Sequence, residues 1–429
     1  MSLPALAVLF IAGIWNPAGS GLHPDEAAWV NSSYYFELLA RGERSHPDWR
    51  LLPARESPFV GKFLFGLALR MAGRPVRSFE PLAAWHEVWH LPTGTTAWGS
   101  GLARAEREAV SRRLSPEARQ AVREGRYPFL QAGQLGPPRR VVLGFGMLCA
   151  AVVAAIGTRC RGPMTGLAAG LILAAHRLAI EAYTHALFDM IALAFSALAV
   201  LGLIALVGPM RGEPSGLRRM LFVSLITGLM LALAVGTKMN ALIVVMVAAE
   251  LGLIAACRGI WGREHPARGG ALCLGLSLAV GVLVFVAINP TLHGHPWSGL
   301  VDLFAMPART EEVQASFLPD HLIAPSQKAH AIGTILCGHP AGLLVLGLAM
   351  LWPTWNGLRR FSPRTVLVLW WWTALGAVLA WIPFPWPRYV LPVLPPAALL
   401  TADLVASLAG NLTNSLSRPD RGAEIKNQA

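Results

Sequence analysis

Acidic side chains stand beside hydrophobic runs in this sequence, at positions where a carboxylate could act on a substrate. The first pair, Asp25 and Glu26, follows residues 21–24 after a hydrophobic run. Pro24 ends one element, and acids favour the first turn of the next helix because they interact with its free amides and its dipole. A carboxylate there serves as a helix cap, as a general base that takes a proton from a hydroxyl group, or as both.

A second acidic group joins two hydrophobic runs further along the chain. Residues 181–190 hold Glu181, His185 and Asp189. Ionisable side chains at membrane depth are costly, and they usually serve a function. A solvated turn explains the polarity of Glu181, but it explains less well why Asp189 opens a strongly hydrophobic helix. We therefore expect this segment to bind substrate.

Three cations accompany these acids. Lys62 ends the segment 56–62, where a lysine either meets a phosphate or extends its ammonium to water from the end of an interfacial helix. Lys238 interrupts a hydrophobic stretch on the outer side, where the distribution of charge predicts no cation. Arg388 stands beside Tyr389 and several tryptophans. An aromatic belt with an anchoring arginine accounts for the tryptophans better than for the arginine.

Acids and cations at one membrane face suit the transfer of a sugar from a sugar phosphate. One carboxylate takes the proton of an acceptor hydroxyl, and the cations bind the phosphate that leaves. A reaction at a membrane face favours a lipid-linked donor. The acids could also hold a divalent metal ion, so the sequence leaves the cofactor unknown and metal dependence open.

The composition indicates the solvent in which these residues are held. The chain has 429 residues, is 54% hydrophobic and 14% charged, and carries 15 Trp and 32 Pro, a balance that a water-soluble fold would hardly keep in solution. The net charge of +12 does not indicate nucleic acid, because Lys and Arg occupy short gaps between hydrophobic runs. The five cysteines form no CxxC pair and no metal-ligand spacing, so we expect neither disulfides nor a zinc site.

The hydrophobic runs predict an all-α polytopic membrane protein with roughly ten transmembrane helices. The first run, residues 3–15, is short but is interpreted as a span. The other runs are long enough to cross a hydrocarbon core of ~30 Å at a rise of ~1.5 Å per residue. They lie near 141–157, 164–180, 190–208, 220–236, 239–257, 270–288, 331–352, 365–382 and 389–409.

The connectors between these runs predict the topology. Arginines recur on alternate connectors, at 159–161, 211–219, 258–268 and 359–364, and the positive-inside rule places that side in the cytoplasm. Both termini are then cytoplasmic. We expect an integral protein of the plasma (inner) membrane whose active site faces outside, toward the periplasm.

Two long connectors face outward in this topology, at 18–139 and 289–330. The first contains a hydrophobic stretch at 59–71 and a charged helical stretch around 104–123, which we expect to lie along the membrane as interfacial helices. We expect one multi-span domain over residues 1–410. A short polar cytoplasmic tail follows over 411–429.

The order of these motifs resembles the polyprenyl-phosphate-sugar-dependent glycosyltransferases. That family includes the protein O-mannosyltransferases and the lipid A aminoarabinose transferases, and it has the C-type membrane fold. Residues 23–26 (His-Pro-Asp-Glu) look like its Asp-Glu after the first span, and residues 57–62 (Ser-Pro-Phe-Val-Gly-Lys) look like its His-Pro-Pro-Leu-Gly-Lys segment. Asp189 falls where its second acidic motif begins a helix. Residues 236–238 and 388–392 are also similar to recurring family segments.

The resemblance implies a role for each candidate. Asp25 would be the catalytic base that activates an acceptor hydroxyl for in-line attack on the anomeric carbon, with inversion, while polyprenyl phosphate leaves. Glu26 and Asp189 would orient the acceptor or the donor. The expected phosphate contacts are Lys62, Lys238 and Arg388, and the remaining expected substrate-binding residues are Glu181, His185 and Tyr389.

The chain departs from the family pattern at two positions and in its domains. Ser57 and Phe59 stand where the family has His and the second Pro. Neither a soluble carbohydrate-binding domain nor a large outer C-terminal domain is evident. The acceptor therefore stays open between protein, lipid and glycan.

Two other classes of protein compete with a transferase. A multi-span solute or lipid-sugar transporter also has many spans and a few charges, but we find no two-half repeat and no paired breaks in mid-span. The charges also gather at one face rather than midway. A non-catalytic assembly protein could retain the same fold, although an intact Asp25 argues against it.

Overall fold

The computed structural model describes residues 21–23, 25–90, 108–210, 216–261, 265–293, 296–305, 322–382, 384 and 386–416, and these residues form helices and connecting turns without a strand. Seven of the helices are long and hydrophobic enough to cross a membrane. Six of them are α9 (Gly136–Arg161), α12 (Asp189–Met210), α13 (Leu217–Val235), α14 (Leu242–Trp261), α15 (His265–Ile288) and α19 (Pro363–Trp381). The seventh is built from α20 (Pro387–Val390), the short η7 (Leu391–Val393) and α21 (Leu394–Leu416).

Two further helix pairs are bent where the sequence predicts single spans. α10 (Pro163–Ala175) and α11 (Arg177–Thr184) meet at 62°, and α17 (Lys328–Cys337) and α18 (Gly342–Arg360) belong to a pair that meets at 87°. His176 makes the first bend, because its ring accepts the Leu178 N–H as an N-cap. Gly338 ends α17 in the left-handed conformation, at φ 69°.

The count of spans agrees with the sequence if each bent pair crosses the membrane once. The described residues then contain up to nine spans, and the predicted first span, residues 3–15, lies outside the described residues. The predicted fold class, an all-α polytopic membrane protein, is confirmed.

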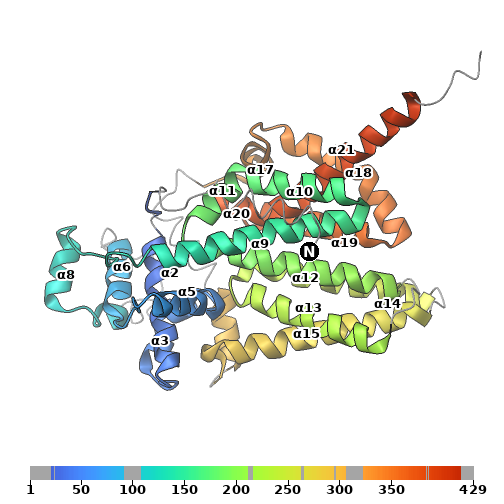
Figure 1. The fold of residues 1–429 in the computed structure, drawn as a ribbon. Helices are drawn as coiled ribbons and strands as arrows, with labels where there is room; N and C mark the ends of the chain where they lie inside the picture. Colours follow the sequence, from blue (N-terminus) through green and yellow to red (C-terminus); the bar gives the residue numbers. More distant parts are fainter. Residues whose placement is uncertain are drawn as a thin grey trace, which may run out of the picture.

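Short helices cover one end of the long ones and form a cap (Figure 1). They come from the predicted outer loop, and the expected helix at 59–71 is α5, with those bounds. The charged stretch is helical at α8, while residues 91–107 lie outside the described residues. The cap comprises α2 (Glu26–Asn31), α3 (Tyr34–Ala40), η2 (Pro47–Arg50), α4 (Leu52–Arg55), α5 (Phe59–Met71), α6 (Glu80–His90) and α8 (Pro116–Arg123).

The remaining described segments are short, apart from the final helix. A helix covers 296–305 within the second predicted loop. α21 continues beyond Gly410 as far as Leu416, so part of the predicted polar tail is helical. The short 3-10 turns are η3 (Met239–Ala241), η4 (Pro290–Leu292) and η6 (Pro325–Gln327).

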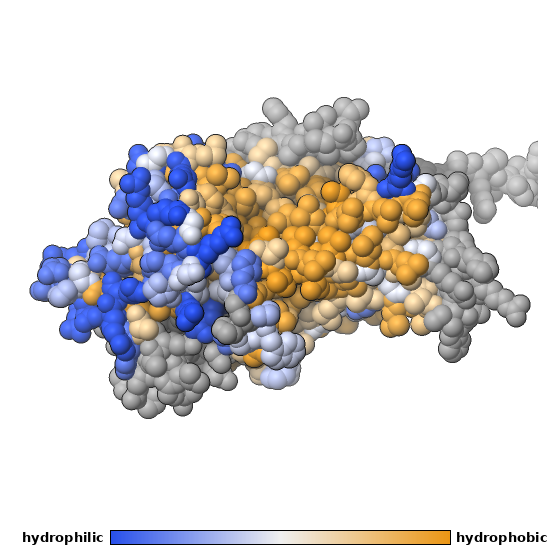
Figure 2. All heavy atoms as spheres, turned by 90° about the horizontal axis from the view of Figure 1, so that it is seen from below, coloured by the Kyte–Doolittle hydropathy of each residue, from blue (hydrophilic) through white to orange (hydrophobic). Residues whose placement is uncertain are grey.

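The surface separates into two zones. Figure 2 shows hydrophobic residues over the long helices and hydrophilic residues gathered at the end that carries the cap. Exposed Phe222, Leu253 and Leu283 lie on α13, α14 and α15. Such a surface is stable against lipid rather than water, as expected for an integral membrane protein.

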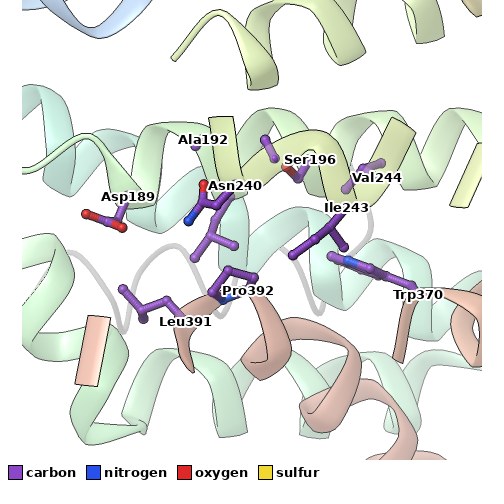
Figure 3. Close-up of a pocket in the computed structure, with 11 residues that line it drawn as sticks. Asp189, Ala192, Ser196, Asn240, Ile243, Val244, Trp370, Leu391 and Pro392 are labelled. Atoms are coloured by element: carbon purple, nitrogen blue, oxygen red, sulfur yellow. The ribbon is translucent and has the colours of Figure 1, made fainter. Parts of the chain in front are cut away.

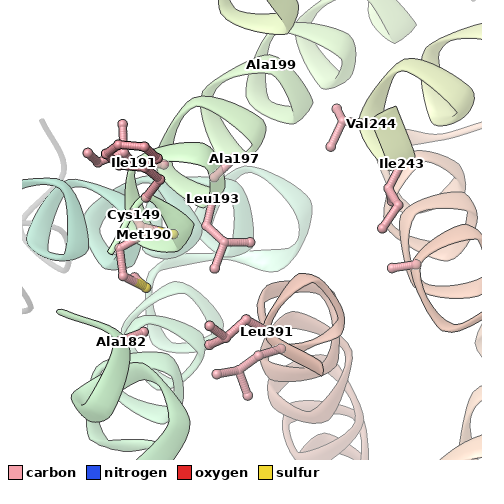
Figure 4. Packing of buried hydrophobic residues seen from close by; sticks show 14 of the residues in the cluster. Cys149, Ala182, Met190, Ile191, Leu193, Ala197, Ala199, Ile243, Val244 and Leu391 are labelled. Carbon is pink, nitrogen blue, oxygen red and sulfur yellow. The ribbon is translucent and has the colours of Figure 1, made fainter. Parts of the chain in front are cut away.

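The core of the bundle is built from close helix pairs with small residues at their contacts. α9 packs against α10 and α12, and α13 packs against α12 and α15. A Cβ added to Gly166 would lie 2.0 Å from the Thr158 hydroxyl, so α9 and α10 approach as closely as a glycine allows. Figure 4 shows Cys149 of α9, Ile191 and Leu193 of α12 and Leu391 of η7 in one hydrophobic cluster.

Candidate active site

The acidic residue at the start of α2 faces an arginine from the far end of the chain. Asp25 is the N-cap residue of α2, and its Oδ2 accepts a hydrogen bond from Arg388 in α20, 363 positions away in the sequence. Both side chains are about one-fifth exposed. Oδ1 of Asp25 accepts no hydrogen bond within the part of the chain that the structure describes. The carboxylate is therefore oriented through Oδ2, and Asp25 lines a cavity.

The neighbouring acid is buried and fully bonded. Oε1 and Oε2 of Glu26 accept hydrogen bonds from Arg139 Nε at 2.8 Å and Nη2 at 2.7 Å. The backbone amides of Ala186 and His23 add contacts at 2.6 and 2.8 Å. Burial raises the pKa of Glu26, but these hydrogen bonds outweigh it and hold the pKa below the usual value. Glu26 thus ties α2 to α9 and to the start of the 186–189 turn.

Arg139 was not singled out by the sequence analysis. It lies near the start of α9, at the face where the positive-inside rule predicts no cation, and so carries the same sequence signal as Lys238. Its guanidinium is buried and also donates to the Gly21 carbonyl at 2.6 Å. It is a positioning residue for the segment that carries Asp25.

A second acid–cation pair stands beside the first. Asp189 begins α12, and its Oδ1 accepts a hydrogen bond from Lys238 at 2.5 Å. Asp189 is buried, whereas Lys238 keeps about a quarter of its side-chain surface exposed. Lys238 is the residue just before the η3 turn, where its own backbone is extended.

A cavity of about 270 Å³ opens in front of Asp25. Arg388 and Glu181 also line it, and His23 meets His185 edge to face at 5.6 Å. Burial lowers the pKa of His23, so its ring is neutral at neutral pH. His185 turns a ring nitrogen toward the Glu181 carbonyl at 2.8 Å. We call this the Asp25 cavity; its other lining residues include Leu178, Ala182, Leu187, Trp386, Pro387 and Leu391.

A second cavity of about 390 Å³ borders the segment 386–392, which also lines the Asp25 cavity. It is lined mainly by hydrophobic side chains of α14, α19 and the 296–305 helix, with Asn240 and Tyr389 at its polar edge. We call it the apolar cavity. The segment 386–392 contributes residues to both cavities, and its Trp386 and Tyr389 rings stack at 5.5 Å with Arg388 over both.

A small void lies beneath Asp189, inside the bundle. Its volume is about 10 Å³, which is about the room that one water molecule needs. Figure 3 shows Asp189 at one side of it, with Asn240, Ser196 and Trp370 along its length. Among the described residues, the bundle therefore leaves little room below Asp189 for anything larger than a water molecule.

Lys62 does not join this constellation. Its side chain is 1% exposed, and the ammonium donates to the carbonyls of Pro53, Ala54 and Ser57 at 2.8, 3.1 and 2.8 Å. Burial lowers its pKa to about 7. The three carbonyls occupy its three N–H groups, so Lys62 closes the turn before α5 and is not placed to meet a phosphate.

The arrangement brings together most of the predicted residues and leaves one apart. Asp25, Arg388, Glu181 and His185 line or border the Asp25 cavity, and Asp189 with Lys238 lies next to it through Leu391. Pro24 lies outside the described residues. Among the described residues, no three His, Cys, Asp or Glu side chains are placed to hold a metal ion.

Solved structures of other proteins have a fold similar to that of this chain. No protein-family profile matches the chain, and no curated protein matches it in sequence. Among solved structures, the Archaeoglobus fulgidus oligosaccharyltransferase tethered to an acceptor peptide is similar with a TM-score of 0.59 and 12% identity, over 97% of this chain and 51% of that chain.

Two further solved structures are similar over most of this chain. The Archaeoglobus fulgidus oligosaccharyltransferase AglB, in complex with an inhibitory peptide and a dolichol-phosphate, has a TM-score of 0.50 and 11% identity over 97% of this chain and 52% of that chain. ArnT from Cupriavidus metallidurans, bound to undecaprenyl phosphate, has a TM-score of 0.48 and 16% identity over 94% of this chain and 58% of that chain.

This chain thus has the C-type glycosyltransferase fold, the fold that the resemblance of its motifs implies. It spans between one half and three fifths of the length of these solved chains, from 51% to 58%. At identities of 11 to 16% the likeness concerns the fold, and the activity is argued from the site itself.

Proposed function

We propose that this protein is a membrane glycosyltransferase that moves a sugar from a polyprenyl-phosphate donor to an acceptor hydroxyl, with inversion. The observation that carries the proposal is the position of Asp25 and Arg388. A carboxylate and a guanidinium meet at the wall between a cavity that holds polar groups and a cavity that is almost entirely hydrophobic. A lipid-linked sugar phosphate needs both environments at one reaction centre.

The apolar cavity suits the isoprenoid chain of the donor. Its volume of about 390 Å³ and its lining by Leu303, Phe304 and Ile243 favour a hydrocarbon chain over a polar ligand. An archaeal oligosaccharyltransferase of the same fold was solved with a dolichol-phosphate. Arg388 and Lys238 precede Tyr389 and Met239, which line this cavity, and they are the cations that would bind the phosphate of the donor.

The Asp25 cavity suits the acceptor hydroxyl. The acceptor oxygen forms a bond to the anomeric carbon, and the bond between that carbon and the phosphate oxygen breaks with its electron pair. Asp25 takes the hydroxyl proton, and the polyprenyl phosphate leaves with the electron pair and its negative charge. Arg388 contacts Asp25 and would stabilise the phosphate as charge develops on it.

The other acids would position rather than react. Glu26 has no free oxygen for a substrate, since Arg139 and two amides occupy it. Asp189 is held by Lys238, and together they would fix the donor on the side of Leu391. Glu181 and His185 line or border the acceptor side.

We also propose that the site faces outside and that both termini are cytoplasmic. The support comes from the opposite ends of the helices, where Arg159, Arg161, Arg219 and Arg364 gather, as the positive-inside rule expects of a cytoplasmic side. With the five native cysteines replaced by alanine, a single cysteine in place of Glu117 on the cap or of Arg218 on α13 would test this with a membrane-impermeant thiol reagent. Labelling at position 218 in intact cells, without labelling at 117, would reverse the proposed orientation.

The transfer is tested in membranes that contain equal amounts of wild type, Asp25→Asn or Glu117→Gln. Glu117 is exposed on α8, away from both cavities, so its variant controls for the loss of an acid. A radiolabelled polyprenyl-phosphate-sugar pool should be consumed by the wild type and by Glu117→Gln, and at least about a hundredfold more slowly by Asp25→Asn.

Each other result has a definite meaning. Equal consumption by Asp25→Asn removes Asp25 from the mechanism. Movement of the labelled donor across the membrane without release of the carrier phosphate would favour the transporter over the transferase.

A further inference from the structure

A third cavity lies at the end of the bundle opposite the candidate active site. It measures about 250 Å³ and lies where α9 and α12 end and where α13 and α19 begin. α9 runs from Arg139 at the active site to Arg159 at this cavity, a distance of ~30 Å at ~1.5 Å per residue. Nothing in the proposed transfer uses this end of the protein.

Two arginines line this cavity without a partner. The guanidinium groups of Arg159 and Arg219 make neither an ion pair nor a hydrogen bond with any other residue in the described parts of the chain. The carboxylate at this end, Asp403, is already bound by Arg161 at 3.0 Å and by Arg364 at 3.1 Å. Two guanidinium groups that share one cavity repel each other unless an anion lies between them.

The helix surface below Arg219 is hydrophobic and exposed. Phe222 and Ile226 follow Arg219 by three and seven positions on α13, so they lie on the same face. Their side chains are 64% and 41% exposed. Basic groups at a helix end above an exposed hydrophobic stripe match a phospholipid, which has an anionic head and a hydrocarbon chain.

We propose that this cavity binds the phosphate headgroup of an anionic phospholipid between Arg159 and Arg219. One acyl chain of that lipid lies along Phe222 and Ile226. Guanidinium groups bind phosphate oxygens in pairs, with charge-assisted hydrogen bonds. Inorganic phosphate has the same head chemistry but gains nothing from the hydrophobic stripe.

The test uses the full chain purified in detergent, as wild type, as the double variant Arg159→Gln/Arg219→Gln, and as Arg218→Gln. Arg218 precedes Arg219 but does not line the cavity, so its variant controls for the loss of charge. Native mass spectrometry during titration with phosphatidylglycerol should show binding to the wild type and to Arg218→Gln, and on the order of tenfold weaker binding to the double variant.

Two further arms identify the ligand. Phosphatidylcholine, which has no net charge, should bind the wild type on the order of tenfold more weakly than phosphatidylglycerol. Inorganic phosphate should leave the thermal unfolding midpoint of the wild type unchanged at concentrations where phosphatidylglycerol raises it. Equal binding by wild type and double variant overturns the site, and an equal effect of inorganic phosphate overturns the lipid. If the double variant does not fold, the comparison of the two lipids and inorganic phosphate on the wild type still decides whether the protein binds an anionic phospholipid.

Discussion

Arg139 binds both carboxylate oxygens of Glu26, and this pair attaches the first helix of the cap to the first long helix of the bundle. The two side chains are 5% and 0% exposed. A buried pair of this kind adds little net stability by itself, but the removal of one partner leaves the other charge buried and unpaired. The position of Asp25, one residue before Glu26, therefore depends on Arg139.

The first prediction concerns this pair. Arg139→Gln should lower the free energy of unfolding by about 3 kcal/mol and should abolish sugar transfer. The neighbouring Arg140→Gln is the matched control, because Arg140 is exposed. Thermal unfolding of the detergent-purified proteins gives the stability, and a similar loss in both variants would contradict a specific role for the Glu26 pair.

The second prediction concerns Lys238. Lys238→Met leaves Asp189 without its cation and removes a proposed phosphate contact, so the KM for the polyprenyl-phosphate-sugar should rise by about tenfold or more. Lys328→Met serves as the control, because Lys328 donates only to the Ala380 carbonyl among the described residues. An unchanged KM for the donor with a reduced kcat would remove Lys238 from donor binding.

The third prediction fills the apolar cavity. Ala377 lines it from α19, and Ala377→Phe should raise the KM for a long-chain donor while a donor with a short, water-soluble chain is affected less. Gly376→Phe places the same ring on the same helix, where a Cβ meets open space. Transfer assays with donors of different chain length measure the difference, and an equal effect on both donors would show that the cavity does not hold the chain.

The fourth prediction concerns pH. Burial lowers the pKa of His23 below 6.5, so the unfolded chain binds more protons than the folded chain just below pH 6.5. Stability should therefore fall as the pH drops through this window. Glu26 does not contribute there, because its pKa lies below 4.5 and it remains ionised in both states.

His23→Gln tests this dependence. The Asp25 N–H, which donates to the His23 ring in the wild type, can donate to the glutamine side-chain oxygen in the variant. The unfolding midpoint of the variant should fall less between pH 7 and pH 5, a range set by the ordinary histidine value of ~6.5. His46→Gln is matched, because His46 caps the Asp48 N–H in the same way. A steeper decrease in His23→Gln than in the wild type would contradict the prediction.

The sequence predicted the long helices well because their hydrophobic runs are longer than any alternative element allows. It also placed the start of α12 at Asp189, because an acid before a hydrophobic run is typical of a helix N-terminus. α5 matches the predicted stretch 59–71, because that stretch is also mainly hydrophobic.

The bends and the buried pairs could not be predicted in this way. Hydropathy averaged over a run does not reveal that His176 caps a new helix, or that Gly338 adopts a positive φ. Lys62 has the same sequence context whether its ammonium points to lipid phosphate or into the turn at Ser57. The partnership of Asp25 with Arg388 depends on helices that meet only after the whole chain has folded.

In the proposed reaction, the segment 386–392 separates the cavity for the acceptor from the cavity for the carrier lipid. Leu178, Ala182 and Leu187 shape the Asp25 cavity alone, and Leu303, Phe304 and Met246 shape the apolar cavity alone. Substitutions in one group would alter the choice of acceptor without disturbing the fit of the carrier. An enzyme built in this way can diverge toward new acceptors in a lineage that keeps its carrier lipid, because the two selectivities are inherited at different positions.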